Sequence, residues 1–175
     1  MASITIISAT NRPDSNTEKI ANYYFNAFKS KGADVDFLSL KNLPESFLFS
    51  ELYGKRSPEF QEIIDKYIDK QTKFVFIIPE YNGSYAGILK VFLDAVHPKY
   101  WTENKALLTG VATGRAGNLR GMEHLTNVLN YLKVNVYHNK LPISKVDTLL
   151  DQMGNVVDPD TIRVIDAQIE GFLKF

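Results

Sequence analysis

The chain of 175 residues contains no cysteine. Disulfides, thiolate catalysis, iron–sulfur clusters and cysteine-bound zinc are therefore excluded. The three histidines, His97, His124 and His138, stand far apart in the sequence, and none has the spacing of a metal-ligand pair. We therefore expect no metal site, and any redox chemistry must be carried by a bound cofactor.

The chain also lacks an excess of charge of either sign, because 20 basic residues balance 20 acidic ones. Binding to nucleic acid or to an anionic membrane needs a concentrated basic surface, which this balance does not indicate. No apolar run approaches the roughly 20 residues that span a bilayer, and Met1-Ala2-Ser3 leads straight into a strand pattern. We expect a cytoplasmic protein with no nucleic-acid partner and no membrane insertion.

Several nucleotide and hydrolase motifs are missing as well. The sequence has no G-x-G-x-x-G and no Walker A motif, which disfavours a Rossmann dinucleotide fold and a nucleoside-triphosphatase. It has no G-x-S-x-G elbow and no second carboxylate paired with Glu80, which disfavours a hydrolase. Internal repeats are also absent. With 45% apolar residues, residues 1–175 are predicted to form a single domain with a sizeable core.

The most informative stretch spans residues 73–97. Residues 74–78 are apolar at every position and are closed by Pro79, as in an inner strand of a parallel sheet that is covered on both faces. The polar turn formers of residues 80–84 follow, and then apolar residues recur at helical spacing from residue 86 to 96. The sequence therefore predicts a strand, a polar loop and a helix, with the loop at the sheet edge where ligands bind in α/β folds.

A second loop of the same kind follows the first predicted strand, residues 4–7. Residues 8–17 are rich in hydroxyls and precede a helix with an apolar face. Hydroxyls, helix amides and the helix dipole favour an anion, and Arg12 adds a charged donor suited to a phosphate. The alternative is an ordinary helix cap made by Asp14 or Ser15, with Arg12 in solvent.

The remaining elements alternate regularly. Strands are predicted at residues 34–38, 105–113 and 134–137, and residues 141–146 extend or cross the sheet edge. Helices are predicted to start at Ser57-Pro58 and Asp158-Pro159, and another carries the apolar stripe from Met122 to Leu132. This alternation indicates an α/β protein with a five-stranded, doubly wound parallel sheet.

Two stretches together resemble a known family. Residues 79–90 and Leu93-Asp94 match the P-E-Y-N-x-S-x-x-G-x-L-K-N-x-L-D motif of the NADPH-dependent FMN reductase family. Residues 10–17 resemble that family's S-x-R-x-x-S-x-N phosphate loop, with threonine at both ends. The resemblance implies a flavodoxin-like three-layer α/β/α sandwich whose parallel strands have the order 2-1-3-4-5.

The resemblance also implies an FMN site built from three loops. Five residues are expected at the phosphate, six at the flavin ring and three in a glycine-containing loop after the fourth strand. These are Thr10, Arg12, Ser15, Asn16 and Thr17; Pro79, Glu80, Tyr81, Asn82, Gly83 and Ser84; and Thr113, Gly114 and Gly117. We expect no catalytic acid or base among the side chains, because the flavin supplies the reactivity.

The function implied is an FMN-dependent NAD(P)H oxidoreductase that works by ping-pong hydride transfer. NADPH or NADH reduces the bound FMN, which then reduces a small-molecule acceptor such as a quinone, free flavin or azo compound. The alternatives are a flavin-binding electron carrier without nicotinamide turnover, against which the zero net charge counts, and a nucleotide-binding module without flavin.

The family resemblance further implies a homodimer or homotetramer. The aromatic residues Phe47, Phe49, Tyr100 and Trp101 are compatible with a subunit contact. Packing of these side chains into the protein's own core is the alternative, and the sequence does not separate the two.

Overall fold

The protein is described by a computed structural model that covers residues 3–53 and 56–175. Its centre is a parallel sheet with strand order β2-β1-β3-β4-β5, in which β6 also pairs with β4. The strands are β1 (Ser3–Ser8), β2 (Asp34–Ser39), β3 (Lys73–Pro79), β4 (Lys105–Val111), β5 (Asn135–Val136) and β6 (Leu141–Ile143). The predicted order 2-1-3-4-5 is confirmed, and it is the order of flavodoxin-like sheets.

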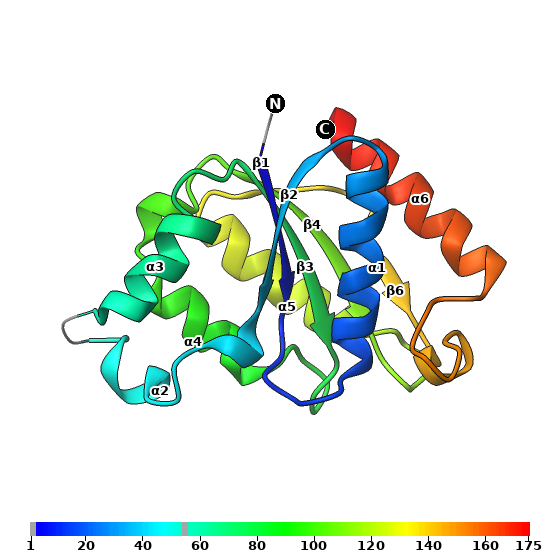
Figure 1. Cartoon of the computed structure of the whole chain (residues 1–175), viewed down its shortest axis with the longest axis horizontal. Helices are drawn as coiled ribbons and strands as arrows, with labels where there is room; N and C mark the ends of the chain where they lie inside the picture. Colours follow the sequence, from blue (N-terminus) through cyan, green and yellow to red (C-terminus); the bar gives the residue numbers. More distant parts are fainter. Residues whose placement is uncertain (1–2, 54–55) are drawn as a thin grey trace.

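Helices cover both faces of the sheet, so the predicted three layers are present. In Figure 1, α1 and α6 lie on one side of the strands and α3, α4 and α5 on the other. The helices are α1 (Asn16–Ser30), α2 (Phe47–Ser50), α3 (Pro58–Tyr67), α4 (Gly87–Ala95), α5 (Leu119–Tyr131) and α6 (Pro159–Lys174), with short 3₁₀ turns η1 (Leu40–Asn42), η2 (Pro98–Tyr100) and η3 (Val146–Thr148). All the strands point the same way, so their carboxyl ends share one edge.

Strand β3 is the centre of the core, as its apolar sequence predicts. All seven of its residues are buried, and they alternate between two hydrophobic clusters. Phe74, Phe76 and Ile78 face the cluster under α3, α4 and α5, whereas Val75 and Ile77 face the cluster under α1 and α6. The strand is therefore held from both faces, and its carboxyl end is a rigid base for the loop that follows.

The fifth position in the sheet is divided between two short strands. Strand β5 pairs only with Lys105 and Ala106 of β4, and β6 pairs with the carboxyl-terminal half, from Thr109 to Val111. The predicted fifth strand at residues 134–137 is thus reduced to two paired residues, and residues 141–143 extend the same edge. This division carries the chain to the carboxyl edge of the sheet at β6.

Two of the four aromatic residues considered for a subunit contact belong to the core instead. Trp101 is 0% exposed and packs edge-on against Phe74 at 4.9 Å between ring centroids. Phe47 is buried against Phe60 at 5.0 Å. For these two residues the structure shows core packing, the alternative that the sequence left open, because α2 and the segment after α4 fold back onto the sheet. Of the four residues, Phe49 is the one that is fully outside, at 90% exposure.

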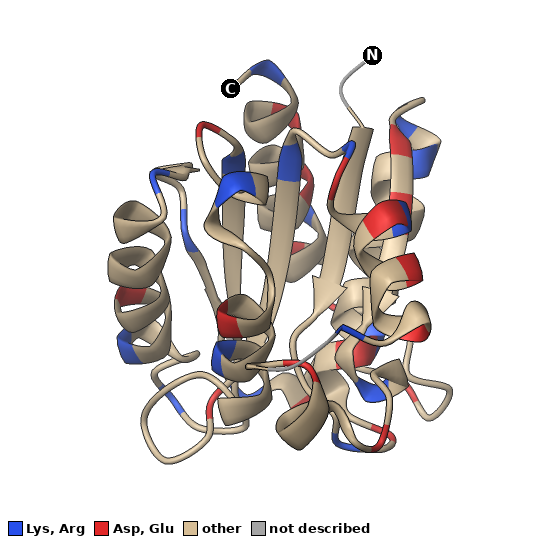
Figure 2. Ribbon diagram, turned by 90° about the vertical axis from the view of Figure 1, so that its left-hand side faces the viewer, with Lys and Arg blue, Asp and Glu red and all other residues tan. Residues whose placement is uncertain are grey.

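The surface carries both signs of charge throughout. Figure 2 shows basic and acidic residues interspersed over the helices and loops, with the strands largely free of charge. Five ion pairs of the described residues, among them Lys41 with Glu18 and Lys90 with Asp94, join neighbouring opposite charges. Among the described residues, no helix is both long and apolar enough to cross a membrane.

Candidate functional site

The loop between β1 and α1 is held by its own hydroxyl groups. Thr10 is buried, and its Oγ1 accepts a hydrogen bond from the backbone amide of Arg12 at 3.1 Å. Ser15 caps α1, since its Oγ accepts from the amide of Glu18 at 3.1 Å. Of the two predicted caps, the structure therefore uses Ser15, and Asp14 occupies a left-handed turn position with φ 50°.

The cap leaves two donors free at the start of α1. The amides of Glu18 and Lys19 bond to the Ser15 carbonyl at 3.1 and 3.3 Å. The amides of Asn16 and Thr17 have no backbone partner within the described part of the chain, and both residues line a cavity. Unpaired first-turn amides and the helix dipole make this end of the cavity suited to an anion.

The loop after β3 is a tight hairpin-like turn. Tyr81 and Ser84 exchange backbone hydrogen bonds, with N···O distances of 2.8 and 3.1 Å. The two central residues both have positive φ, 52° at Asn82 and 75° at Gly83, which is the type I′ geometry that Asn-Gly favours. The polar turn predicted at residues 80–84 is thus present.

This turn already uses most of its own amides. The Glu80 amide donates to the Val111 carbonyl at 3.0 Å, and the amides of Tyr81 and Ser84 close the turn. Only Asn82 and Gly83 keep amides without a backbone partner among the described residues of the turn. Residues 80–84 can therefore offer two backbone amides to a ligand, both at the tip of the turn.

The third loop, after β4, divides into a part at the cavity and a part away from it. Thr113 lines the cavity, whereas the carbonyl of Gly114 accepts from the Lys145 amide at 3.1 Å. Gly117, with φ 55°, is buried against β6, where an added Cβ would lie 2.7 Å from Pro142. Gly117 is thus required for packing of the loop, a need that the sequence alone did not separate from ligand contact.

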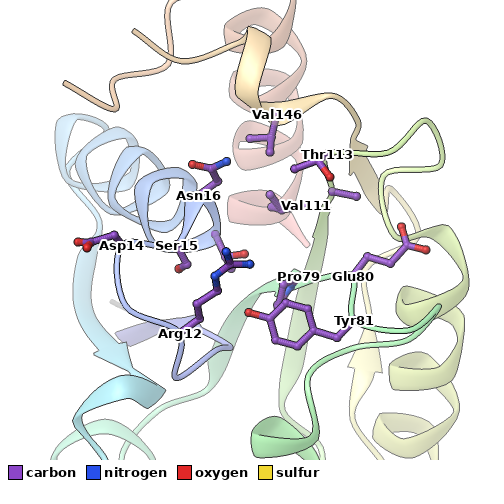
Figure 3. A pocket seen from close by; sticks show the side chains of 12 residues that line it. Arg12, Asp14, Ser15, Asn16, Pro79, Glu80, Tyr81, Val111, Thr113 and Val146 are labelled. Atoms are coloured by element: carbon purple, nitrogen blue, oxygen red, sulfur yellow. The ribbon is translucent and has the colours of Figure 1, made fainter. Parts of the chain in front are cut away.

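These three loops meet at a cavity of about 240 Å³ at the carboxyl edge of the sheet. Figure 3 shows the guanidinium of Arg12 projecting into it, with the Tyr81 ring beside it and the Asp14 carboxylate pointing away. Eight of the predicted residues line the cavity: Arg12, Ser15, Asn16, Thr17, Pro79, Glu80, Tyr81 and Thr113. The other six, Thr10, Asn82, Gly83, Ser84, Gly114 and Gly117, lie behind it or beyond its rim.

The β1–α1 loop and the turn after β3 are joined directly. The hydroxyls of Thr10 and Tyr81, 71 residues apart in sequence, are hydrogen bonded at 2.8 Å. This bond holds the Tyr81 hydroxyl next to the β1–α1 loop. Thr10 therefore belongs to the site as a support for Tyr81 and for the Arg12 backbone, without lining the cavity itself.

Four cavity residues were not predicted from the sequence. Asp14, Val111 and Ala112 lie within two positions of predicted site residues in the sequence. That proximity is the signal by which they could have been predicted. Val146 is different, because it lies in η3, more than thirty residues beyond β4. Its amide donates to the Ala112 carbonyl at 3.1 Å. No local sequence pattern predicts this contact.

A buried polar network lies deeper on the α1 side of the sheet. The Tyr24 hydroxyl bonds to Thr109 at 2.8 Å, and Gln168 Nε2 donates to the carbonyls of Leu108 and Asn139 at 3.1 and 2.7 Å. Burial raises the pKa of Tyr24 well above its ordinary value. Tyr24 therefore stays protonated, and the network stabilises packing of α1 and α6 instead of supplying an acid or base.

No group of three or more potential metal ligands occurs among residues 3–53 and 56–175. Of the histidines, His124 forms a 2.9 Å hydrogen bond with Ser84. The donors at the cavity are guanidinium, hydroxyl and amide groups, which suit an anionic organic ligand better than a cation.

Comparison with known families decides the class of ligand. The family model described as NADPH-dependent FMN reductase matches residues 2–148. The chain belongs to this family. The resemblance carried by residues 10–17 and 79–94 is thereby confirmed. As a family member, the protein is an oxidoreductase of the group that uses FMN and NAD(P)H.

Curated relatives of this FMN reductase family member cover most of the chain. A 2-hydroxy-1,4-benzoquinone reductase of a Burkholderia species is 25% identical over 174 residues, 97% of this chain and 93% of the relative. An NAD(P)H-dependent FMN reductase of Pseudomonas aeruginosa is 27% identical over 144 residues, 79% of this chain and 76% of the relative.

Solved structures agree with the fold. FerB, a flavoenzyme NAD(P)H:(acceptor) oxidoreductase of Paracoccus denitrificans, superposes with a TM-score of 0.82 at 19% identity, over 99% of this chain and 96% of that one. The apo form of the NADH:FMN oxidoreductase EmoB gives a TM-score of 0.79 at 18% identity, over 98% and 88% of the two chains. At these identities the agreement concerns the flavodoxin-like fold.

The residues at the cavity fit FMN in chemical character. One end offers the Arg12 guanidinium and the free amides of Asn16 and Thr17, which match a phosphate. Beside it (Figure 3), Tyr81 offers a flat side chain that matches a planar ring. The amides of Asn82 and Gly83, which match the polar edge of such a ring, belong to residues beyond the cavity lining. The site of this family member is therefore polar and cationic where Arg12 lies, with a flat surface at Tyr81.

Proposed function

We propose that the protein is an NAD(P)H-dependent oxidoreductase that holds FMN in the cavity between the β1–α1 loop and the turn after β3. The observation that carries this proposal is the convergence of a guanidinium, two free helix amides and an aromatic ring on one cavity at the carboxyl edge of the sheet. FMN held there would supply the redox chemistry of a ping-pong cycle, with NAD(P)H as the hydride donor and a small molecule as the acceptor.

The protein's part begins with the phosphate. Arg12 offers charge-assisted hydrogen bonds, and the amides of Asn16 and Thr17 offer donors aligned with the α1 dipole. Ser15 is engaged in capping α1 and contributes by fixing the direction of those amides. Binding here is electrostatic, so the affinity for FMN should fall with rising salt.

The residues at the ring end would position the flavin ring. The Tyr81 side chain, held by Thr10, offers a flat surface, and the tip amides of Asn82 and Gly83 can donate to a ring edge on which negative charge develops. Pro79, Glu80 and Thr113 complete the wall of the cavity. No side chain is assigned as a catalytic acid or base, because positioning is the chain's contribution.

The acceptor is proposed to be a small oxidised molecule, such as a quinone, free flavin or azo compound. The names of the Burkholderia and Pseudomonas relatives support the first two classes. We further propose that residues 1–175 act as one FMN-binding domain in the cytoplasm. Assembly into a homodimer or homotetramer is part of the proposal, supported by exposed aromatic side chains at Phe49 and Tyr131.

The test is direct. The purified protein, stripped of flavin, should quench FMN fluorescence on titration, and the complex should then oxidise NADPH or NADH only when menadione, free FMN or an azo dye is supplied. Binding of FMN without nicotinamide oxidation would favour the electron carrier instead. A protein that binds no FMN would reject the proposal altogether, and sedimentation or light scattering would measure the assembly.

A further inference from the structure

Asn118 is a buried polar residue that the site described above does not use. It stands at the start of α5 with 0% exposure. Its φ of 63° places it in the left-handed region, which is uncommon for any residue but glycine. A buried amide in such a conformation needs a reason, because a glycine would relieve the backbone and an apolar residue would avoid burying the polar group.

The side chain reaches across to the end of the central strand. Its Nδ2 donates to the carbonyls of Ile78 and Pro79 at 3.2 and 2.7 Å. Carbonyl oxygens only accept, so the amide must present its nitrogen to them and turn Oδ1 away. That Oδ1 is buried and has no hydrogen-bond partner among the described residues. The orientation of the amide is thus set by β3.

Glycines make the space for this side chain. A Cβ added at Gly121, one turn into α5, would collide with Asn118 Oδ1, and one added at Gly110 of β4 would lie 3.0 Å from the Asn118 Cβ. Burial of an unpaired oxygen is unfavourable. The packing around Asn118 therefore accommodates an amide whose buried oxygen is unfavourable. What the amide provides in return is its two hydrogen bonds to β3.

Those bonds complete a clamp on one peptide. The peptide between Pro79 and Glu80 has its carbonyl bound by Asn118 and its amide bound to the Val111 carbonyl at 3.0 Å. Both polar groups of this peptide are therefore fixed. Beyond it, the closed type I′ turn leaves little freedom, so the direction of the tip amides of Asn82 and Gly83 follows from the plane of the clamped peptide.

We propose that Asn118 is a positioning residue for the ring end of the site: by clamping the Pro79–Glu80 peptide, it aims the turn of residues 80–84 at the flavin ring. This inference rests on the proposed function. It assigns Asn118 no contact with FMN, and it predicts that loss of the side chain weakens recognition of the ring while leaving recognition of the phosphate intact.

The decisive variant is Asn118→Gly, which keeps the left-handed backbone available and removes only the clamp. FMN and riboflavin should both bind about tenfold more weakly by fluorescence titration, so that the ratio of their affinities is unchanged. Asn118→Asp should bind both more weakly still, because a carboxylate would face two carbonyl oxygens. Binding of both flavins by Asn118→Gly within about twofold of the wild type would overturn the inference.

A matched control separates positioning from loss of stability. Gln168→Ala also removes a buried amide that donates to two carbonyls, those of Leu108 and Asn139, but on α6 and away from the cavity. It should lower the melting temperature and leave flavin affinity unchanged. An equal loss of affinity in the two variants would overturn the inference. A wild type that binds no FMN would overturn the proposed function first, and the inference with it.

Discussion

The proposed phosphate end and the proposed ring end of the site are built in different ways. The proposed phosphate end comes from one continuous segment, residues 10–17, whose capping and turn bonds are nearly all local. The proposed ring end combines the turn after β3 with Thr113 from the loop after β4 and Val146 from η3, and it is braced by Asn118 at the start of α5. Substitutions at the first end should therefore act locally, whereas those at the second should act through distant supports.

The largest effect is expected at Arg12. Arg12→Ala removes a charged donor from the cavity, and hydrogen bonds to charged groups contribute about 1.5–3 kcal/mol, so FMN should bind about 10- to 100-fold more weakly. Riboflavin, which lacks the phosphate, should bind as before. Fluorescence titration with both flavins measures this, and Arg163→Ala on the exposed face of α6 is the control. Equal weakening of both flavins would place Arg12 at the ring end.

A smaller effect is expected at Gly83, and it should not distinguish FMN from riboflavin. Its φ is 75°, and an added Cβ would lie 2.8 Å from Arg120 Nη1. Left-handed backbone costs other residues about 1–2 kcal/mol, so Gly83→Ala should weaken the binding of FMN and of riboflavin alike, by about 5- to 30-fold.

The neighbouring Asn82→Gly is the matched control for that prediction. Asn82 also has positive φ, 52°, and glycine adopts this conformation readily. Its flavin affinities should therefore stay close to those of the wild type. If Gly83→Ala weakens the binding of FMN but not of riboflavin, the turn after β3 does not face the ring.

Tyr81→Phe tests how strongly the two ends are coupled. It keeps the ring and removes the hydroxyl bond to Thr10, a neutral hydrogen bond that contributes about 0.5–1.5 kcal/mol. FMN affinity should fall only about threefold. In the double variant with Arg12→Ala the losses should not add, because Thr10 supports both residues. Strict additivity would show that the two ends act independently.

The smallest effect on the site is expected from the opposite edge of the sheet. Lys73 begins β3, where burial, with the nearby charge of Lys105, lowers its pKa. Between the lowered folded pKa and the ordinary value, the unfolded chain binds more protons, so stability should rise with pH through that window. Lys73→Met should lose this rise, measured by chemical denaturation from neutral pH to about pH 10.

Flavin affinity should be the same in Lys73→Met and the wild type at neutral pH. Among the described residues, the Lys73 Nζ bonds to two carbonyls near the end of α6, at 2.9 and 3.1 Å. Lys73 begins β3, whereas the cavity lies at the other end of that strand. A change in FMN affinity in this variant would mean that the two edges of the sheet are coupled through β3.

Much of the site could be predicted where one short segment carries the whole signal. The Asn82-Gly83 pair specifies its turn because both residues tolerate positive φ. Ser15 precedes an amphipathic helix and caps it, as its position predicts. Residues 74–78 are apolar throughout and are buried throughout.

Other features could not be predicted from local patterns. The chain could not reveal that the Glu80 amide is already bound to Val111, or that Gly117 is required by Pro142. The local sequence around Trp101 and around Phe47 is compatible with either a buried or an exposed side chain. The path of the chain after α4 and around α2 is what buries them.

By itself, the sequence determined the α/β fold class, the polar loops after β1 and β3 and the family, because periodicity, turn propensity and contiguous motifs act over a few residues. Only the tertiary structure decided which amides stay free, that Val146 joins the cavity, and that Asn118 clamps the end of β3. Hydrogen bonds of this second kind join residues about 30 to 70 positions apart. Their partners are chosen by the packing of the sheet and helices, which no local stretch of sequence specifies.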